Sequence, residues 1–132
     1  MNTEIQELKQ RLSKLTVLYV EDEEEMRLGT EIFLNKFFSL VDTAVDGEDG
    51  LNKYIATPSD IVFTDILMPN MDGLEMLGNI LKINKDVFCI ALTASDVSPD
   101  DINKKTSLYF RKPVTYENMV VIMKSIADKL DL

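Results

Sequence analysis

Five short apolar runs alternate with longer amphipathic segments along this chain, which leaves few folds open to it. The runs consist mostly of Val, Ile, Leu and Phe, as in parallel strands buried on both faces, and lie at residues 17–20, 41–45, 61–64, 87–93 and 108–110. Helices are predicted after each run, at residues 24–38, 48–55, 74–83, 99–104 and 116–130. Asp72 and Thr115 are the expected N-caps of the third and fifth of these helices. This order of elements predicts an α/β fold: a doubly wound, five-stranded parallel sheet with helices on both faces.

The start of the chain precedes this pattern. We predict a helical extension at residues 1–14, in front of a main domain at residues 15–132. Ile5, Leu8, Leu12 and Leu15 follow one another at helical spacing, so they would form one apolar stripe. Two interpretations of the stripe are open. It can pack on the chain's own domain, or it can belong to a dimerising or linking helix.

The composition excludes several classes of function. A net charge of −9 argues against direct binding of nucleic acid, which needs a basic surface. The chain lacks a membrane-spanning apolar run and the apolar part of a signal peptide, so a soluble, cytoplasmic protein is expected. Cys89 is the only cysteine and cannot form an internal disulfide. The absence of histidine excludes Ser-His or Cys-His catalysis, His-ligated metal sites and a phosphohistidine within this chain.

Polar side chains stand at the carboxyl ends of four of the predicted strands. In an open parallel sheet these ends meet at one edge, where ligands bind. The side chains expected there are three acids, a hydroxyl and an ammonium, at Glu21 and Asp22, Asp65, Thr93 and Lys112. Converging carboxylates repel one another unless a cation joins them, and an all-oxygen ligand set favours Mg²⁺.

This set of side chains is typical of phosphoryl chemistry. A carboxylate such as that of Asp65 can act as a nucleophile on phosphorus and form an aspartyl phosphate. Phosphoryl transfer depends mainly on positioning and charge neutralisation, which Mg²⁺, Lys112 and Thr93 with a backbone N–H can supply. Pro113 follows Lys112, and a cis bond there would aim the lysine inward.

Four sequence runs resemble the receiver domains of bacterial two-component response regulators. They are VLYVEDEEEMR, DIVFTDILMPNMDGLEML, ALTAS and YFRKP, and the resemblance extends over about residues 15–130. It implies a flavodoxin-like sheet with the strand order 2-1-3-4-5. It also implies a signalling module of a phosphorelay, not a turnover enzyme acting on external substrates.

The resemblance further assigns roles to individual residues. Asp65 would be the phosphoacceptor, and Mg²⁺ would be bound by the side chains of Asp22 and Asp65, by the backbone carbonyl of Leu67 and, through a water molecule, by Glu21. Glu21 stands where these domains often carry Asp, and an indirect role tolerates the longer side chain.

The remaining roles concern the phosphoryl group and the conformational switch. Thr93 and Lys112 would contact the phosphoryl group, and Ala94 would take part in binding it. Tyr109 would be an aromatic switch that moves inward when Thr93 shifts; the alternative is that Tyr109 is plain core. Leu67 cannot orient an attacking water, so a fairly persistent phosphoryl group is expected.

The stretch from Thr93 to Lys112 is shorter than is usual in the family. The fourth helix is therefore expected to have only one or two turns, which puts the usual output surface in doubt.

The implied partners are a sensor histidine kinase or histidine phosphotransfer protein, and a downstream protein target or effector domain. Phosphorylation could also drive formation of a homodimer. Two alternatives stay open: a degenerate receiver that binds partners without phosphate, and a small phosphatase with an Asp nucleophile. The phosphatase would need a second acid two residues after Asp65, where this chain has Leu67.

Overall fold

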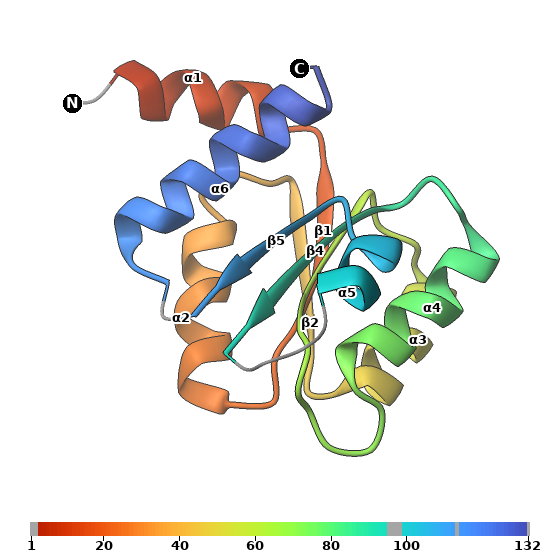
Figure 1. The fold of residues 1–132 in the computed structure, drawn as a ribbon. Coiled ribbons are helices and arrows are strands. Elements are labelled where there is room, and N and C mark those ends of the chain that lie inside the picture. The colour runs from red at the N-terminus through yellow and green to blue at the C-terminus, as the bar shows by residue number, and fades with distance from the viewer. Residues whose placement is uncertain (1–2, 95–98, 113, 132) are drawn as a thin grey trace.

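A single parallel sheet forms the centre of the molecule in the computed structural model, which describes residues 3–94, 99–112 and 114–131 (Figure 1). Its five strands are β1 (Thr16–Val20), β2 (Leu40–Ala44), β3 (Ile61–Asp65), β4 (Phe88–Thr93) and β5 (Leu108–Arg111). They are ordered β2-β1-β3-β4-β5, and every neighbouring pair is parallel. The predicted fold class and strand order are confirmed.

Helices cover both faces of the sheet. They are α1 (Thr3–Leu12), α2 (Glu24–Leu34), α3 (Gly47–Ala56), α4 (Gly73–Ile83), α5 (Pro99–Lys105) and α6 (Tyr116–Lys129). In Figure 1, α1, α2 and α6 lie on one side of the sheet, and α3, α4 and α5 lie on the other. Alternate strand residues serve the two sides: Tyr19 and Phe63 pack in one core, and Leu18 and Val62 pack in the other.

Most element boundaries agree with the sequence prediction, but the end of α2 does not. The helix ends at Leu34, whereas the apolar pattern predicted a helix as far as residue 38. Phe37 and Phe38 are buried beyond the helix, in a turn closed by bonds from their N–H groups to the Leu34 carbonyl. The two rings therefore fill the core where the chain turns into β2, instead of extending the helix.

The helix starts that were predicted from capping residues are confirmed. The Asp72 side chain accepts a hydrogen bond from the Glu75 N–H at the start of α4. Thr115 accepts one from the Asn118 N–H at the start of α6. With seven residues, α5 is as short as expected.

The apolar stripe of α1 packs on the chain's own core. Leu8 and Leu12 are buried against the cluster that includes residues of α6, and Ile5 is partly buried there. Arg11 also donates a hydrogen bond to Asp128 of α6 at 3.1 Å. The structure therefore agrees with the first interpretation of the stripe. Among the described residues there is no helix with the length and apolar character that crossing a bilayer requires.

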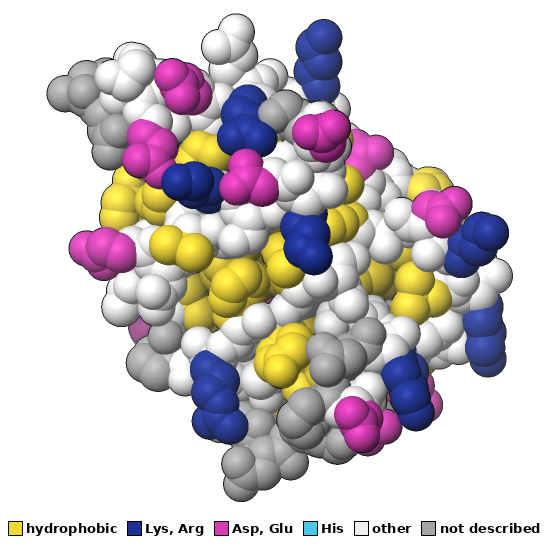
Figure 2. All heavy atoms as spheres, turned by 45° about the horizontal axis from the view of Figure 1, so that its top comes forward, with side chains coloured by type: hydrophobic (Ala, Val, Ile, Leu, Met, Phe, Trp, Pro, Cys, Tyr) yellow, Lys and Arg dark blue, Asp and Glu magenta, His cyan; other side chains and the backbone are white. Residues whose placement is uncertain are grey.

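The surface of the molecule is chemically mixed on the face turned toward the reader in Figure 2. Acidic and basic side chains alternate there, with hydrophobic side chains exposed between them. The net charge of −9 is thus not displayed as one uniform acidic surface.

Candidate functional site

The three acids predicted to converge do meet at the carboxyl edge of the sheet. Asp65 is the last residue of β3, and Glu21 and Asp22 follow directly after β1, the neighbouring strand. Carboxylate oxygens of these three residues all lie within 4.8 Å of one another. Glu21 and Asp65 are buried and Asp22 is exposed, so the cluster opens to solvent on the Asp22 side.

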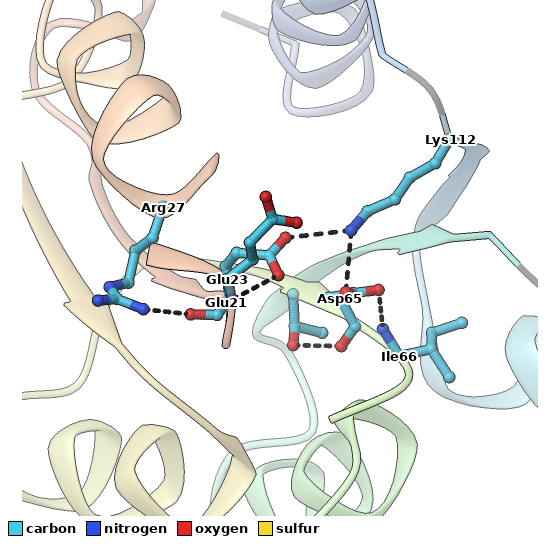
Figure 3. Close-up of polar contacts among 7 residues, drawn as sticks. Glu21, Glu23, Arg27, Asp65, Ile66 and Lys112 are labelled. Carbon is cyan, nitrogen blue, oxygen red and sulfur yellow. Dashed lines mark hydrogen bonds and ion pairs between the residues drawn. The ribbon is translucent and has the colours of Figure 1, made fainter. Parts of the chain in front are cut away.

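Lys112 joins two of these carboxylates. Its Nζ lies 2.9 Å from Asp65 Oδ2 and 3.1 Å from Glu21 Oε1 (Figure 3). The backbone of Lys112 is fixed as well, because its N–H donates to the Thr93 carbonyl at 2.8 Å just beyond the paired strands β4 and β5. Residues from three separate strand ends therefore form one ion-paired group.

Backbone groups hold each acid in place. The N–H of Ile66 donates to Asp65 Oδ1 at 2.8 Å, while the other carboxylate oxygen of Asp65 faces Lys112. The N–H of Glu23 donates to Glu21 Oε2 at 3.2 Å, and Arg27 donates to the Glu21 carbonyl (Figure 3). Asp65 thus has one oxygen bound to the backbone and one directed at the ammonium.

The charges in the site do not balance. Burial raises the pKa of Glu21, and the bonds from Glu23 and Lys112 offset this only in part. Burial works to lower the pKa of Lys112, but the carboxylates of Asp65 and Glu21 outweigh it and hold that pKa above its ordinary value. Three carboxylates face one ammonium, so the site keeps an excess of negative charge that a bound cation would neutralise. The donor set consists of oxygens alone, which fits a hard divalent ion such as Mg²⁺.

The loop after Asp65 is fixed by features that the sequence did not reveal. Asn70 has a left-handed backbone with a φ of 67°, and its side chain donates to Asp46 Oδ2 at 2.7 Å. The N–H of Gly47 donates to the Met71 carbonyl at 3.0 Å, so the start of α3 is bound to this loop. A Cβ at Gly47 would lie 2.2 Å from the Met71 carbonyl oxygen, which only glycine avoids. The sequence run after Asp65 includes a glycine directly after Asp72, as the family resemblance leads one to expect. Nothing in the sequence indicates the contact between Gly47 and Met71.

The other residues predicted to act in the site lie around the cluster. Thr93 is buried at the end of β4, and Ala94 follows it and is exposed. Leu67 lies two residues past Asp65 with an exposed side chain. Tyr109 pairs in register with Ala91 and is 40% exposed, so in this structure it is a surface residue and not core. Pro113 lies outside the described residues, so the structure does not test whether a cis bond before it aims Lys112 inward.

Tyr19 is a buried polar residue near the site that sequence reasoning missed. Its ring packs edge-on against Phe63, and its hydroxyl makes no hydrogen bond within the part of the chain that the structure describes. Burial raises the pKa of Tyr19, the nearby Thr30 side chain offsets this in part, and the negative charges of Glu21 and Asp65 raise it further. The signal was its position two residues before Glu21, because residues two apart in an extended chain point to the same side.

Together, the fold and this edge define a flavodoxin-like α/β protein with an acidic pocket suited to a divalent cation. The chain belongs to the response regulator receiver domain family, whose model matches residues 17–124.

Comparison with individual relatives agrees with this assignment. Protein PilG of Pseudomonas aeruginosa is 30% identical over 124 residues, covering 89% of this chain and 91% of PilG. Transcription factor prr1 of Schizosaccharomyces pombe is 33% identical over 112 residues, covering 82% of this chain and 21% of prr1. Three such relatives are much longer, and the chain spans only 16–48% of their length.

One solved structure is similar to this chain in both fold and sequence. It is CheY of Borrelia burgdorferi in a complex with CheX, BeF3 and Mg²⁺, which is 29% identical with a TM-score of 0.75. The match covers 89% of this chain and 96% of that one.

Proposed function

We propose that this receiver domain accepts a phosphoryl group on Asp65 from a phosphohistidine of another protein, in a Mg²⁺-dependent reaction. The observation that carries the proposal is the position of Asp65 Oδ2, 2.9 Å from the Lys112 ammonium and within a cluster of three carboxylates. The chain contains no histidine, so the phosphoryl donor is a separate sensor histidine kinase or histidine phosphotransfer protein. Such a pathway operates in the cytoplasm.

Asp22 and Asp65 would hold Mg²⁺ directly, Glu21 through a water molecule and Leu67 through its carbonyl. When bound, the ion neutralises negative charge on the phosphoryl oxygens and on the carboxylates.

The side chains of the site prepare Asp65 for nucleophilic attack. The Ile66 N–H fixes Oδ1, and this orients the carboxylate with Oδ2 toward Lys112. In the reaction, a bond forms between a carboxylate oxygen and phosphorus while the bond between phosphorus and the donor's imidazole nitrogen breaks. The electron pair leaves with the imidazole nitrogen. Lys112 then pairs with a phosphoryl oxygen, and Thr93 with Ala94 binds another.

The response to phosphorylation begins at Thr93. Its carbonyl already accepts a bond from the Lys112 N–H, so a shift of either residue moves the ends of β4 and β5 together. We infer that Thr93 follows the phosphoryl oxygens and that Tyr109, exposed on β5, turns inward. The result is a population shift that a downstream target, an effector domain or a second copy of the chain can read.

The experiment is incubation with a small acyl phosphate and Mg²⁺, followed by measurement of the intact mass. We expect the mass of one phosphoryl group on the wild-type chain and on the control Asp86→Asn, whose carboxylate is exposed and precedes β4, at the amino end of the sheet. Asp65→Asn, or removal of Mg²⁺ with EDTA, should abolish the gain. No gain on the wild-type chain would instead favour the degenerate receiver that binds partners without phosphate. Turnover of phosphate esters would contradict the assignment as a signalling module.

A further inference from the structure

A basic hollow lies between α4 and α5, on a chain that is otherwise strongly acidic. It has a volume of about 540 Å³, and its lining includes Lys82, Lys104 and Lys105. A second hollow of about 180 Å³ shares Lys104 and Lys105 with the first and adds Lys85. Because the two share residues, they form one surface, which we call the α4–α5 groove.

The groove carries uncompensated positive charge. Its lining contains four lysines and one acidic residue, Glu75, giving a formal charge of +3 on a chain whose net charge is −9. Ion pairs among the described residues involve Arg11, Lys53, Lys112 and Lys124, and none of the groove lysines.

The shape of the groove gives a ligand access to these lysines. Gly78 leaves part of the α4 side of the groove without a side chain, and Lys105 lies over it: a Cβ at Gly78 would be 3.4 Å from the Lys105 ammonium. Lys82, Lys85 and Lys104 are exposed, and Lys105 is half-buried.

Helix electrostatics alone do not account for this arrangement. Lysines are favoured in the last turn of a helix by the helix dipole, which applies to Lys82 in α4 and to Lys104 and Lys105 in α5. The dipole does not explain why the ends of two helices converge on one hollow, nor why Lys85, outside both helices, adds to it. The convergence indicates a binding surface for anions.

The groove lies away from the phosphoacceptor cluster. Helix α4 begins at Gly73, whose N–H donates a hydrogen bond to the carbonyl of Ile66, the residue after Asp65. The groove lysines lie toward the other end of α4. The groove is also lined by Val87 and Cys89, at the amino end of β4, whereas the carboxylates lie at the carboxyl end of the sheet. A ligand in the groove would therefore leave Asp65 accessible.

We propose that the α4–α5 groove binds an acidic segment of a partner protein. Charge complementarity supports this occupant, because a short chain carrying several carboxylates can pair with lysines on both sides of the groove. Nucleic acid and anionic membranes present extended negative surfaces, which the remaining charge of this chain repels. A short acidic peptide reaches the four lysines without approaching that charge.

The test is a titration of the full-length, isotope-labelled chain with a short peptide of alternating glutamate and alanine, at low ionic strength, followed by amide NMR. A peptide with glutamine in place of glutamate is the uncharged control. We expect saturable shifts at residues 82, 85 and 104–107, caused only by the acidic peptide and weakened by added salt. The charge reversal Lys104→Glu/Lys105→Glu should weaken binding by about tenfold or more. Lys36→Glu/Lys129→Glu makes the same change of charge at exposed positions outside the groove and should leave the affinity within about twofold.

Several results would overturn the proposal. They are the absence of shifts, shifts centred elsewhere, and equal weakening by both double variants. Tighter binding of a single-stranded oligonucleotide or of phosphatidylserine vesicles at the same lysines would assign the groove to another class of partner. Circular dichroism spectra and urea unfolding like those of the wild-type chain show that both double variants are folded, and this control does not depend on the function of Asp65.

Discussion

Among the described residues, Lys112 is the one positive charge that pairs with the carboxylate cluster, and its replacement with methionine removes this charge while keeping a side chain of similar length. In the wild-type chain its Nζ lies 2.9 Å from Asp65 and 3.1 Å from Glu21. At an effective dielectric constant of about 20, each contact corresponds to about 5.5 kcal/mol of Coulomb attraction, much of it cancelled by desolvation of the ions. Removal of one partner from a buried ion pair costs about 3–5 kcal/mol. Because the Lys112 side chain is 15% exposed, we expect the lower value, about 3 kcal/mol.

This loss of stability should depend on pH in a defined direction. Burial already raises the pKa of Glu21 above its ordinary value of 4.5, and loss of the ammonium raises it further. An acid whose pKa is higher in the folded state contributes most stability below its unfolded pKa and loses that contribution as the pH rises through the folded value. The difference between wild type and Lys112→Met should therefore be small near about pH 5 and largest near about pH 8.

Divalent cations should reduce the loss of stability caused by Lys112→Met. Without the ammonium the carboxylates have no competing partner, so Lys112→Met should bind Mg²⁺ more tightly than the wild type does. A ligand at about a hundred times its dissociation constant stabilises the folded state by about 2.7 kcal/mol. Because saturating Mg²⁺ stabilises both proteins, the difference in stability should shrink only by the difference in their affinities, about 1.4 kcal/mol for each tenfold by which Lys112→Met binds the ion more tightly.

The assay is urea unfolding followed by circular dichroism, with Mg²⁺ or EDTA, at the two pH values. Lys124→Met is the matched control, because Lys124 forms an exposed ion pair with Glu4 at 3.8 Å and should change stability by less than about 0.5 kcal/mol. A loss for Lys112→Met that is the same at both pH values and with or without Mg²⁺ would refute the electrostatic reasoning.

Three further predictions concern single positions. The phosphoryl group on the wild-type chain should persist, and Leu67→Asn should shorten its lifetime by providing an amide that orients water; an unchanged or longer lifetime would contradict this explanation of its persistence. Gly47→Ala should lower the free energy of unfolding by about 2 kcal/mol or more, because its Cβ would lie 2.2 Å from the Met71 carbonyl oxygen; unchanged urea unfolding would show that the two loops separate freely. Cys89 is buried, which raises the pKa of its thiol to about 12, so a thiol reagent should modify it only in urea; rapid reaction of the folded chain would contradict that burial.

The sheet could be predicted from the sequence because a strand that is buried on both faces consists of a continuous run of apolar residues. Residues 61–65 are an example, since all five are buried in β3 and almost all of them were predicted as strand. The end of α2 could not be predicted in this way. Phe37 and Phe38 are apolar at positions that continue the helical pattern, and only the packing of the finished core shows that they leave the helix.

The convergence of the acids was also predictable, since the carboxyl ends of parallel strands share an edge. The contacts between Asn70 and Asp46 and between Met71 and Gly47 were not, because they join two loops that lie far apart in the sequence. The α4–α5 groove was missed for a similar reason. Its lysines come from two helices and a loop, and no spacing in the sequence indicates that they share a hollow.

The central claim, that Asp65 is the residue that carries the phosphoryl group, can be tested directly by locating the modification. Borohydride reduces an aspartyl phosphate to homoserine, which tandem mass spectrometry of peptides then places in the sequence. After treatment with an acyl phosphate and Mg²⁺, the account predicts homoserine at position 65 and at no other aspartate. Homoserine at Asp22, or an unreduced phosphoryl group on a hydroxyl such as that of Thr93, would contradict it.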